Sequence, residues 1–218
     1  MEKNILTICI PSKSEMCSLT TCCILGIQND PEILSKCRLR LSLCLGQSDL
    51  PKLRSEQLSG WYRTAKRGDV FMFIDADQTF SPKDILKSLQ FLEKYDVVCG
   101  AYCKKSGGIT VTPYNYINFY KNKEGELYYG ATGFMMMKYD IVDNIAKTLG
   151  KELWVSKDSK AYPFFYERVI DDPILSIKDQ WLSEDFSFCR LVIKLGGTIY
   201  GYISPTIGHT LPIEKFIS

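Results

Sequence analysis

Two carboxylates follow a short apolar run in the first half of the chain. Residues 70–74 read Val-Phe-Met-Phe-Ile, and Asp75, Ala76 and Asp77 come directly after them. Such a run is typical of a strand that is buried on both faces. Two acids this close repel each other, and a divalent cation relieves the repulsion. Because carboxylate oxygens suit Mg²⁺ or Mn²⁺, the spacing predicts a metal site that can hold a diphosphate.

A second acid pair and the single histidine lie near the C-terminus. Glu184 and Asp185 follow Ser183 at the start of a stretch with helical spacing, and His209 stands in an Ile-Gly-His-Thr turn. Acids are favoured in a first helical turn by the helix dipole alone, so the pair is either a helix start or a general base. His209 is either a metal ligand or a loop histidine with ordinary hydrogen bonds.

Alternating strands and helices must position these residues. The predicted strands are 5–10, 39–45, 70–74 and 96–102, and the predicted helices are 15–27, 49–66 and 81–94. Ser81 followed by Pro82 marks the start of the third helix. Crossover helices between strands predict an α/β domain with a mostly parallel central sheet and helices on both faces. In such sheets, ligands bind beyond the carboxyl ends of the strands.

The second half of the chain is less regular. It holds a turn at 105–108, a hairpin expected near 122–125, an apolar run at 133–137, and helices expected at 140–149 and 183–195. We interpret the chain as one domain, in which residues 1–104 bind a nucleotide and residues 105–218 form the side that faces a second substrate, the acceptor.

The composition excludes several classes of protein. The chain has 218 residues and a formal net charge of +2, which is too weak to indicate a nucleic-acid partner. No stretch approaches the roughly 20 apolar residues of a membrane span. The nine cysteines include no C-x-x-C pair, which favours reduced thiols and a cytoplasmic location.

An ordered set of motifs resembles the GT-A-fold glycosyltransferases of the family-2 type. Asp75-Ala76-Asp77 resembles their D-x-D motif, and the other segments follow in the family's order. These segments are Ile8-Cys9-Ile10-Pro11-Ser12, Leu50-Pro51-Lys52-Leu53-Arg54-Ser55, Val97-Val98-Cys99-Gly100-Ala101-Tyr102 with Lys104, Ala131-Thr132-Gly133-Phe134-Met135, Ser183-Glu184-Asp185-Phe186-Ser187-Phe188-Cys189 and Gly208-His209. The nearest likeness is to glycosyltransferase domains encoded by large algal (chlorella) viruses. It implies a viral protein in the host cytoplasm, as the first domain of a longer polypeptide.

The resemblance implies a role for each matching residue. The cation, Mn²⁺ or Mg²⁺, is expected on Asp77 and His209, and the donor on seven residues of the first half. These seven residues are Pro11, Ser12, Arg54, Asp75, Ala76, Asp77 and Lys104. Within this set, Pro11 and Ser12 line the nucleotide, Arg54 reaches the base or a phosphate, and Lys104 reaches a phosphate.

The same resemblance implies an inverting transfer of glucose or rhamnose from a UDP-sugar to a hydroxyl of a glycan or glycoprotein. Asp185 is expected to be the general base and Glu184 to orient the acceptor or the base, with Gly133 and Trp181 on the acceptor side. Many relatives carry an Asp after the second strand to read uracil. This chain has Gly46-Gln47-Ser48-Asp49 there, so Gln47 is the candidate for that contact.

Three other functions are alternatives to a glycosyltransferase. Asp75-Ala76-Asp77-Gln78-Thr79 also resembles the D-x-D-x-T motif of haloacid-dehalogenase phosphatases, with Asp75 as nucleophile, Asp77 as acid/base and Asp171-Asp172 on magnesium. A nucleotidyltransferase needs a glycine-rich loop after the first strand, and Pro11-Ser12-Lys13-Ser14 has no glycine. The last is a sugar-nucleotide-binding module without activity.

Overall fold

An eight-stranded sheet forms the centre of the computed structural model, which describes residues 3–13, 15–44, 46, 49–104, 108–150, 154–155, 160–172 and 177–210. The strand order is β2-β1-β3-β8-β5-β13-β7-β6. The strands are β1 (Ile5–Pro11), β2 (Arg38–Cys44), β3 (Val70–Ile74), β5 (Val97–Ala101), β6 (Val111–Pro113), β7 (Glu124–Gly130), β8 (Phe134–Lys138) and β13 (Ile199–Ile203).

Strand directions follow from the pairings. β1 is parallel to β2 and β3, β8 is antiparallel to β3 and β5, and β13 is parallel to β5. β7 is antiparallel to β13 and β6. All the strands except β7 and β8 therefore run in one direction, which confirms a mixed, mostly parallel sheet in one α/β domain.

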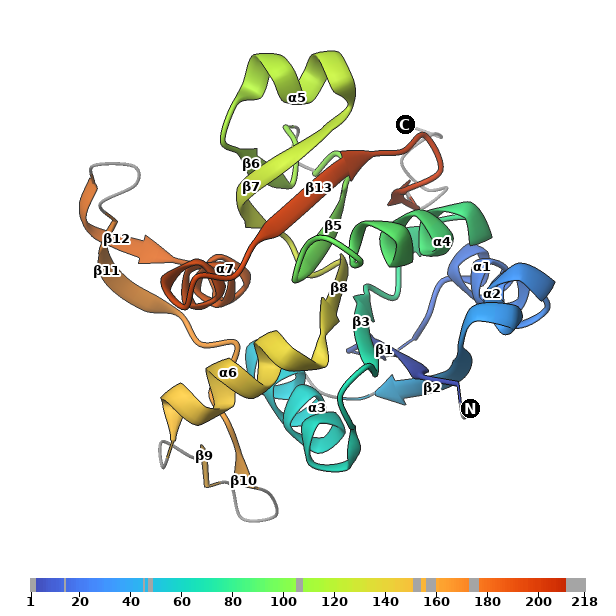
Figure 1. Ribbon diagram of the computed structural model, residues 1–218, viewed down its shortest axis with the longest axis horizontal. Coiled ribbons are helices and arrows are strands. Elements are labelled where there is room, and N and C mark those ends of the chain that lie inside the picture. Colours follow the sequence, from blue (N-terminus) through green and yellow to red (C-terminus); the bar gives the residue numbers. More distant parts are fainter. Residues whose placement is uncertain are drawn as a thin grey trace.

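Helices cover both faces of this sheet, as predicted (Figure 1). On one face, α1, α2 and α4 pack over a core that includes Ile24, Ile33 and Ile85. On the other face, α3, α6 and α7 pack over a second core that includes Leu58 and Ile145. The helices are α1 (Ser18–Gln28), α2 (Pro31–Lys36), α3 (Leu50–Thr64), α4 (Pro82–Phe91), α5 (Tyr116–Asn122), α6 (Tyr139–Leu149) and α7 (Glu184–Lys194).

Strand β3 shows why the run at 70–74 is apolar throughout. Phe71 and Phe73 point into the core under α3 and α7, whereas Met72 and Ile74 point into the core under α1 and α4. A strand covered on both faces has no polar side, so its sequence cannot alternate.

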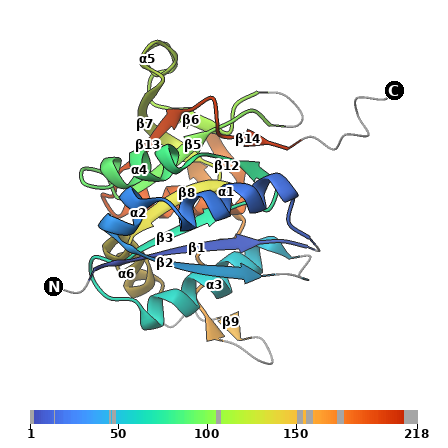
Figure 2. The ribbon, with the colours of Figure 1, turned by 90° about the vertical axis from the view of Figure 1, so that its right-hand side faces the viewer.

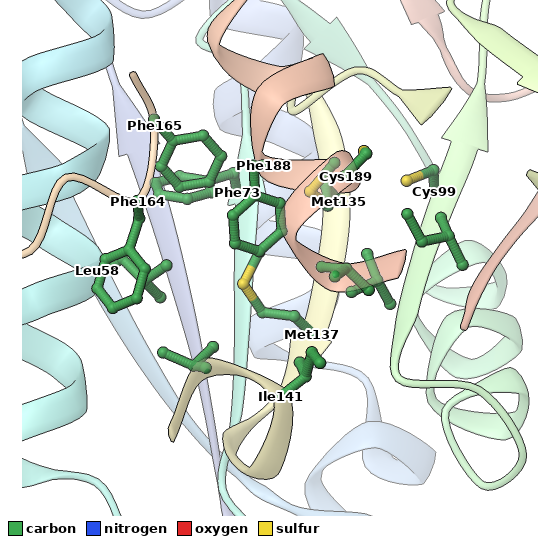
Figure 3. Close-up of a cluster of buried hydrophobic side chains, with 14 of the residues drawn as sticks. Leu58, Phe73, Cys99, Met135, Met137, Ile141, Phe164, Phe165, Phe188 and Cys189 are labelled. Atoms are coloured by element: carbon green, nitrogen blue, oxygen red, sulfur yellow. The ribbon is translucent and has the colours of Figure 1, made fainter. Parts of the chain in front are cut away.

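Aromatic rings fill the core between β3 and α7 (Figure 3). Phe165 packs edge-on against Phe73 at 5.4 Å and stacks on Phe188 at 4.6 Å. The buried hydroxyl of Ser55 on α3 accepts from Phe165 N at 2.9 Å and donates to Phe165 O at 3.2 Å. The segment around Phe165 is thereby fixed to α3.

Helix starts agree with their sequence signals. The Asp84 carboxylate accepts from Ser81 N at 2.7 Å, and Asp49 Oδ1 accepts from Lys52 N at 3.1 Å. α1 begins at Ser18, three residues later than expected, after the Cys17 backbone has bonded Ala76 O.

The prediction of a hairpin near residues 122–125 is wrong. α5 ends at Asn122, Lys123 adopts a left-handed conformation at φ 60°, and β7 begins at Glu124. The turn-like residues therefore join a helix to a strand. The predicted turn at 105–108 lies mostly outside the described residues.

Three two-stranded sheets complete the fold. They pair β9 (Trp154–Val155) with β10 (Lys160–Ala161), β11 (Arg168–Asp172) with β12 (Ile177–Leu182), and β4 (Gln78–Thr79) with β14 (Gly208–His209). All nine cysteines are free thiols. No helix within the described ranges has the length and apolar character needed to cross a bilayer.

Candidate active site

Two cavities lie at opposite ends of the central strands. One, of about 800 Å³, is near the amino ends of β1 and β3 and includes Asn4 and Val70 in its lining. The other, of about 720 Å³, is at the carboxyl ends of the same strands. Figure 2 shows β1, β2 and β3 ending on the same side as β14. The second cavity is the candidate site because both D-x-D acids line it. Its lining residues are Pro11, Ser12, Lys13, Glu15, Met16, Cys17, Ser18, Leu50, Asp75, Ala76, Asp77 and Thr210.

The loop after β1 forms one wall of this cavity. Ser12 N donates to Cys44 O at 2.8 Å, which extends the β1–β2 ladder, and the Ser12 hydroxyl donates to Glu15 O at 2.6 Å. Cys17 N donates to Ala76 O at 2.9 Å. The predicted residues Pro11, Ser12 and Ala76 are therefore brought together, although the Ser12 hydroxyl is used within its own loop.

Asp75 is held from two sides. Its backbone N donates to Gly133 O at 3.0 Å, one residue beyond the last β3–β8 pair, Ile74 with Phe134. Its Oδ1 accepts from Arg54 Nη2 at 2.9 Å, and Arg54 Nη1 donates to Glu184 Oε1 at 2.9 Å. The Arg54 side chain, 5% exposed, thus joins the D-x-D loop to the first turn of α7.

The charges in this group shift one another's pKa values. Burial lowers the pKa of Arg54, but Asp75 and Glu184 raise it by more, so the net shift is upward and the guanidinium stays charged. Burial raises the pKa of Glu184, Asp185 raises it further, and Arg54 opposes both effects.

Asp185 and Tyr102 complete the polar centre. Asp185 Oδ1 accepts from the Ser183 hydroxyl and from Phe186 N, the latter at 3.0 Å. Tyr102 is 6% exposed, and its pKa is raised first by burial and then by Asp75 and Asp185. The sequence analysis did not select Tyr102; the available signal was an aromatic residue at the end of a strand that already carried a family motif.

Gly133 lies against the same acids. A Cβ added there would stand 2.0 Å from Tyr102 Oη and 2.8 Å from Asp75 Oδ2. The predicted acceptor-side residue is therefore also beside the Asp75 carboxylate.

His209 reaches the D-x-D loop through the β4–β14 pair, where it stands opposite Gln78. Thr210 N and its hydroxyl donate to Asp77 O at 2.9 Å and 3.1 Å. His209 Nδ1 is 3.0 Å from Cys103 O. Thr210, which lines the cavity, was also not selected from the sequence. Among the described residues, no group of three or more His, Cys, Asp and Glu side chains is placed to hold a metal ion.

Seven of the predicted residues do not line this cavity, and two of these seven, Lys104 and Trp181, also lie outside the contacts described above. Lys104 is exposed and its backbone N bonds Gly108 O at 2.9 Å. Trp181 is 65% exposed on β12. Gln47, the candidate for the base contact, is outside the described residues.

The fold is an α/β domain with a mostly parallel central sheet and helices on both faces, consistent with the GT-A fold. Residues 64–147, which include the D-x-D loop and Gly133, match the family model described as Glycosyl transferase family 2. The match supports a glycosyltransferase-type enzyme with a nucleotide-sugar donor and an acceptor.

Solved structures support the fold alone, since their identities to this chain are low. The structure described as "Crystal Structure of A197 from STIV" is 17% identical, has a TM-score of 0.55, and the match covers 96% of this chain and 86% of that one. The 4-diphosphocytidyl-2C-methyl-D-erythritolsynthase from Anaerococcus prevotii DSM 20548 is 14% identical, with a TM-score of 0.50 and coverages of 99% and 95%. Among curated proteins, none matches the sequence.

Proposed function

We propose that this protein is a metal-dependent glycosyltransferase that moves a hexose or deoxyhexose, such as glucose or rhamnose, from a UDP-sugar to a glycan hydroxyl. One observation carries the proposal. The acids after β3 and the acids that begin α7 meet through Arg54 at the carboxyl edge of the sheet. This contact supports a donor site and a base that lie beside each other.

The residues beside the cavity fit a divalent cation that arrives with the donor. Mg²⁺ is usually bound by one or two carboxylates together with substrate phosphates and waters, so a cage of protein ligands is not required. Asp77 would hold the ion, and Asp75 would contact it through water or bind the ribose. If His209 Nδ1 donates to Cys103 O, its Nε2 keeps the lone pair that a metal needs. A bound cation supplies positive charge for the leaving diphosphate.

Asp185 is the proposed general base. Its carboxylate takes the proton of the acceptor hydroxyl while that oxygen attacks the anomeric carbon, and the bond from this carbon to the diphosphate oxygen breaks with inversion. Ser183 and Phe186 N hold one carboxylate oxygen, which fixes the direction of the other. Glu184, held by Arg54, would orient the acceptor or the base.

The remaining assignments belong to the same proposal. Residues 1–104 bind the donor, with Lys104 on a phosphate, and residues 105–218 face the acceptor, with Trp181 and Gly133 on that side. The kinship with chlorella-virus domains, the cytoplasmic location and the place in a longer polypeptide come from the sequence resemblance alone.

The phosphatase alternative has less support. It needs Asp171 and Asp172 beside Asp75, but their strand, β11, pairs with β12 in a separate two-stranded sheet. Asp75, the required nucleophile, has one carboxylate oxygen bonded to Arg54.

Thermal unfolding with a panel of nucleotide sugars, with and without Mn²⁺, tests the proposal. A donor at 100 times its Kd stabilises the fold by about 2.7 kcal/mol. For a chain of this length, that stabilisation raises Tm by about 5–11 °C. We expect the shift with UDP-sugars and Mn²⁺ together, and its loss in Asp77→Ala. Asp140→Ala, at a surface ion pair with Arg67, is the matched control and should keep the shift.

Turnover separates the donor site from the base. Asp185→Asn should keep the donor-induced shift and lose about 10²–10⁴-fold in transfer rate. Full activity in Asp185→Asn would show that the base is another group. If the wild type hydrolyses a phosphate ester and shows no response to sugar nucleotides, the protein is a phosphatase and the proposed transferase function is wrong.

A further inference from the structure

One buried, positively charged side chain, that of Arg54, lies between the two halves of the proposed site. Arg54 is 4% exposed, and within the described parts of the chain it is the one Lys or Arg side chain in the buried class. A buried charge is costly unless it is paired, and Arg54 is paired twice. Its partners, Asp75 and Glu184, are 21 and 130 residues away in sequence and belong to different elements.

We infer that Arg54 is a positioning residue that holds Asp75 and Glu184 at a fixed separation and sets the charge around the base, without itself contacting the donor. This role rests on the proposed function, because it concerns how the donor-side acid and the base-side helix are kept in register. It differs from the contact with base or phosphate that the family resemblance implies.

The geometry of the contacts supports this role. The two terminal nitrogens of one guanidinium, Nη2 and Nη1, each donate to a different carboxylate at 2.9 Å. The planar fork of arginine fixes both directions at once, which a lysine ammonium on a flexible stem cannot do. The Arg54 side chain therefore fixes the distance between the D-x-D loop and the first turn of α7.

Arg54 is itself rigidly mounted. It lies on α3, where the neighbouring Ser55 is fully buried and bonded to Phe165, and where Ser59 accepts from Tyr162 N at 2.8 Å. Asp75 is held on its other side by its backbone bond to Gly133. A movement of the guanidinium would therefore displace the carboxylates of Asp75 and Glu184 and leave the position of α3 unchanged.

The charges around Arg54 are otherwise negative. Asp75 faces it from the D-x-D loop, and Glu184 and Asp185 face it from α7. Tyr102 at the end of β5 and the buried thiols of Cys99 and Cys189 interact with Asp185. Glu167 before β11 interacts with Glu184, and the Cys9 thiol interacts with Arg54. Arg54 opposes the rise in the pKa of Glu184, so removing the positive charge favours protonated Glu184, and activity should be lost at a higher pH than in the wild type.

The kinetic test compares Arg54→Gln and Arg54→Lys with Arg67→Gln, in which an arginine of an exposed pair with Asp140 is changed. We expect kcat to fall about 10²-fold in Arg54→Gln, because small displacements of a reacting group cost about that much. The donor KM should stay within about threefold, the pattern of lost transition-state positioning and not of lost ground-state binding. The acid limb of the pH profile should move upward in Arg54→Gln and less in Arg54→Lys, which keeps the charge. Arg67→Gln should match the wild type.

A second measurement needs no activity. In a double-mutant cycle by thermal unfolding, Arg54→Gln combined with Glu184→Gln should destabilise less than the two single changes together. Arg54→Lys serves in the same cycle if Arg54→Gln does not fold. Strict additivity, or a raised donor KM with unchanged kcat and pH profile, overturns the inference. If the wild type transfers no sugar but the cycle shows coupling, the proposed reaction fails and the link between the two acids stands.

Discussion

Replacing Gly133 with alanine probes the tightest contact of the site. The added Cβ would stand 2.0 Å from Tyr102 Oη, 2.9 Å from Tyr102 Cζ and 2.8 Å from Asp75 Oδ2. All three distances are far below a van der Waals contact. Tyr102 is buried and Asp75 is bonded to Arg54, so neither can move away freely.

The expected cost follows from overpacking. Forcing one methyl group into a filled site costs about 1–3 kcal/mol. For a chain of this length, each kcal/mol lowers Tm by about 2–4 °C, so Gly133→Ala should lower it by about 2–12 °C. Because the displaced groups include the D-x-D carboxylate, the donor-induced thermal shift should also shrink.

Two variants make the result specific. Gly60→Ala places the same methyl group on α3. Apart from its chain neighbours and the backbone of its own helix, no atom of the described residues lies within 4 Å of the added group. This variant should be more stable by about 0.5–1 kcal/mol because alanine is the better helix former. Tyr102→Phe removes the oxygen that makes the shortest contact, so it should restore part of the loss in a double variant. If Gly133→Ala unfolds at the wild-type temperature, or if Tyr102→Phe restores nothing, the steric argument is refuted.

Three further changes test separate features. Ser55→Ala leaves the buried Phe165 N–H and C=O without their partner and should cost about 1–3 kcal/mol in thermal unfolding. A hydrogen bond with Cys9 lowers the pKa of Cys44 to about 6 against the opposing effect of burial, so the rate of Cys44 alkylation should rise as pH increases through about 6. The stability that the Cys44 thiolate contributes should be lost as pH falls through about 6, and Cys44→Ser should remove both effects. Burial raises the pKa of Glu184 above its usual 4.5, so protonated Glu184 contributes its full stability to the fold below pH 4.5, and this contribution is lost as pH rises through the folded-state pKa. Glu184→Gln should flatten this part of a curve of Tm against pH.

Local patterns predicted most of the elements in the first half. The apolar run at 70–74, the Ser81 cap and the Asp49 cap each describe a structure that forms within a few residues. The position of β8 could not be read in this way. The apolar run at 133–137 was visible, but its insertion between β3 and β5 in the antiparallel direction depends on strands that are distant in sequence.

The same limit applies to the site. Asp75 and Asp77 were found because they are adjacent to a strand end. The bridge from Arg54 to Glu184 joins residues 130 apart, and no local pattern indicates it. Tyr102 is similar, since its closeness to the acids depends on how β5 and the loop before β8 meet.

The pleat of β3 explains why Asp75, and not its neighbour, meets Arg54. Phe71 and Phe73 point toward α3 and α7, and Asp75 continues this alternation because its N–H still bonds Gly133 O in the ladder with β8. One residue inserted between Ile74 and Asp75 would reverse the faces, since side chains alternate with a period of two. The acid would then point toward α1. We expect such an insertion to abolish both the donor-induced thermal shift and the coupling with Arg54. The same insertion next to Gly196, which is exposed and follows α7, should leave both intact. A donor-induced shift that survives the insertion after Ile74 would show that strand parity does not aim this carboxylate.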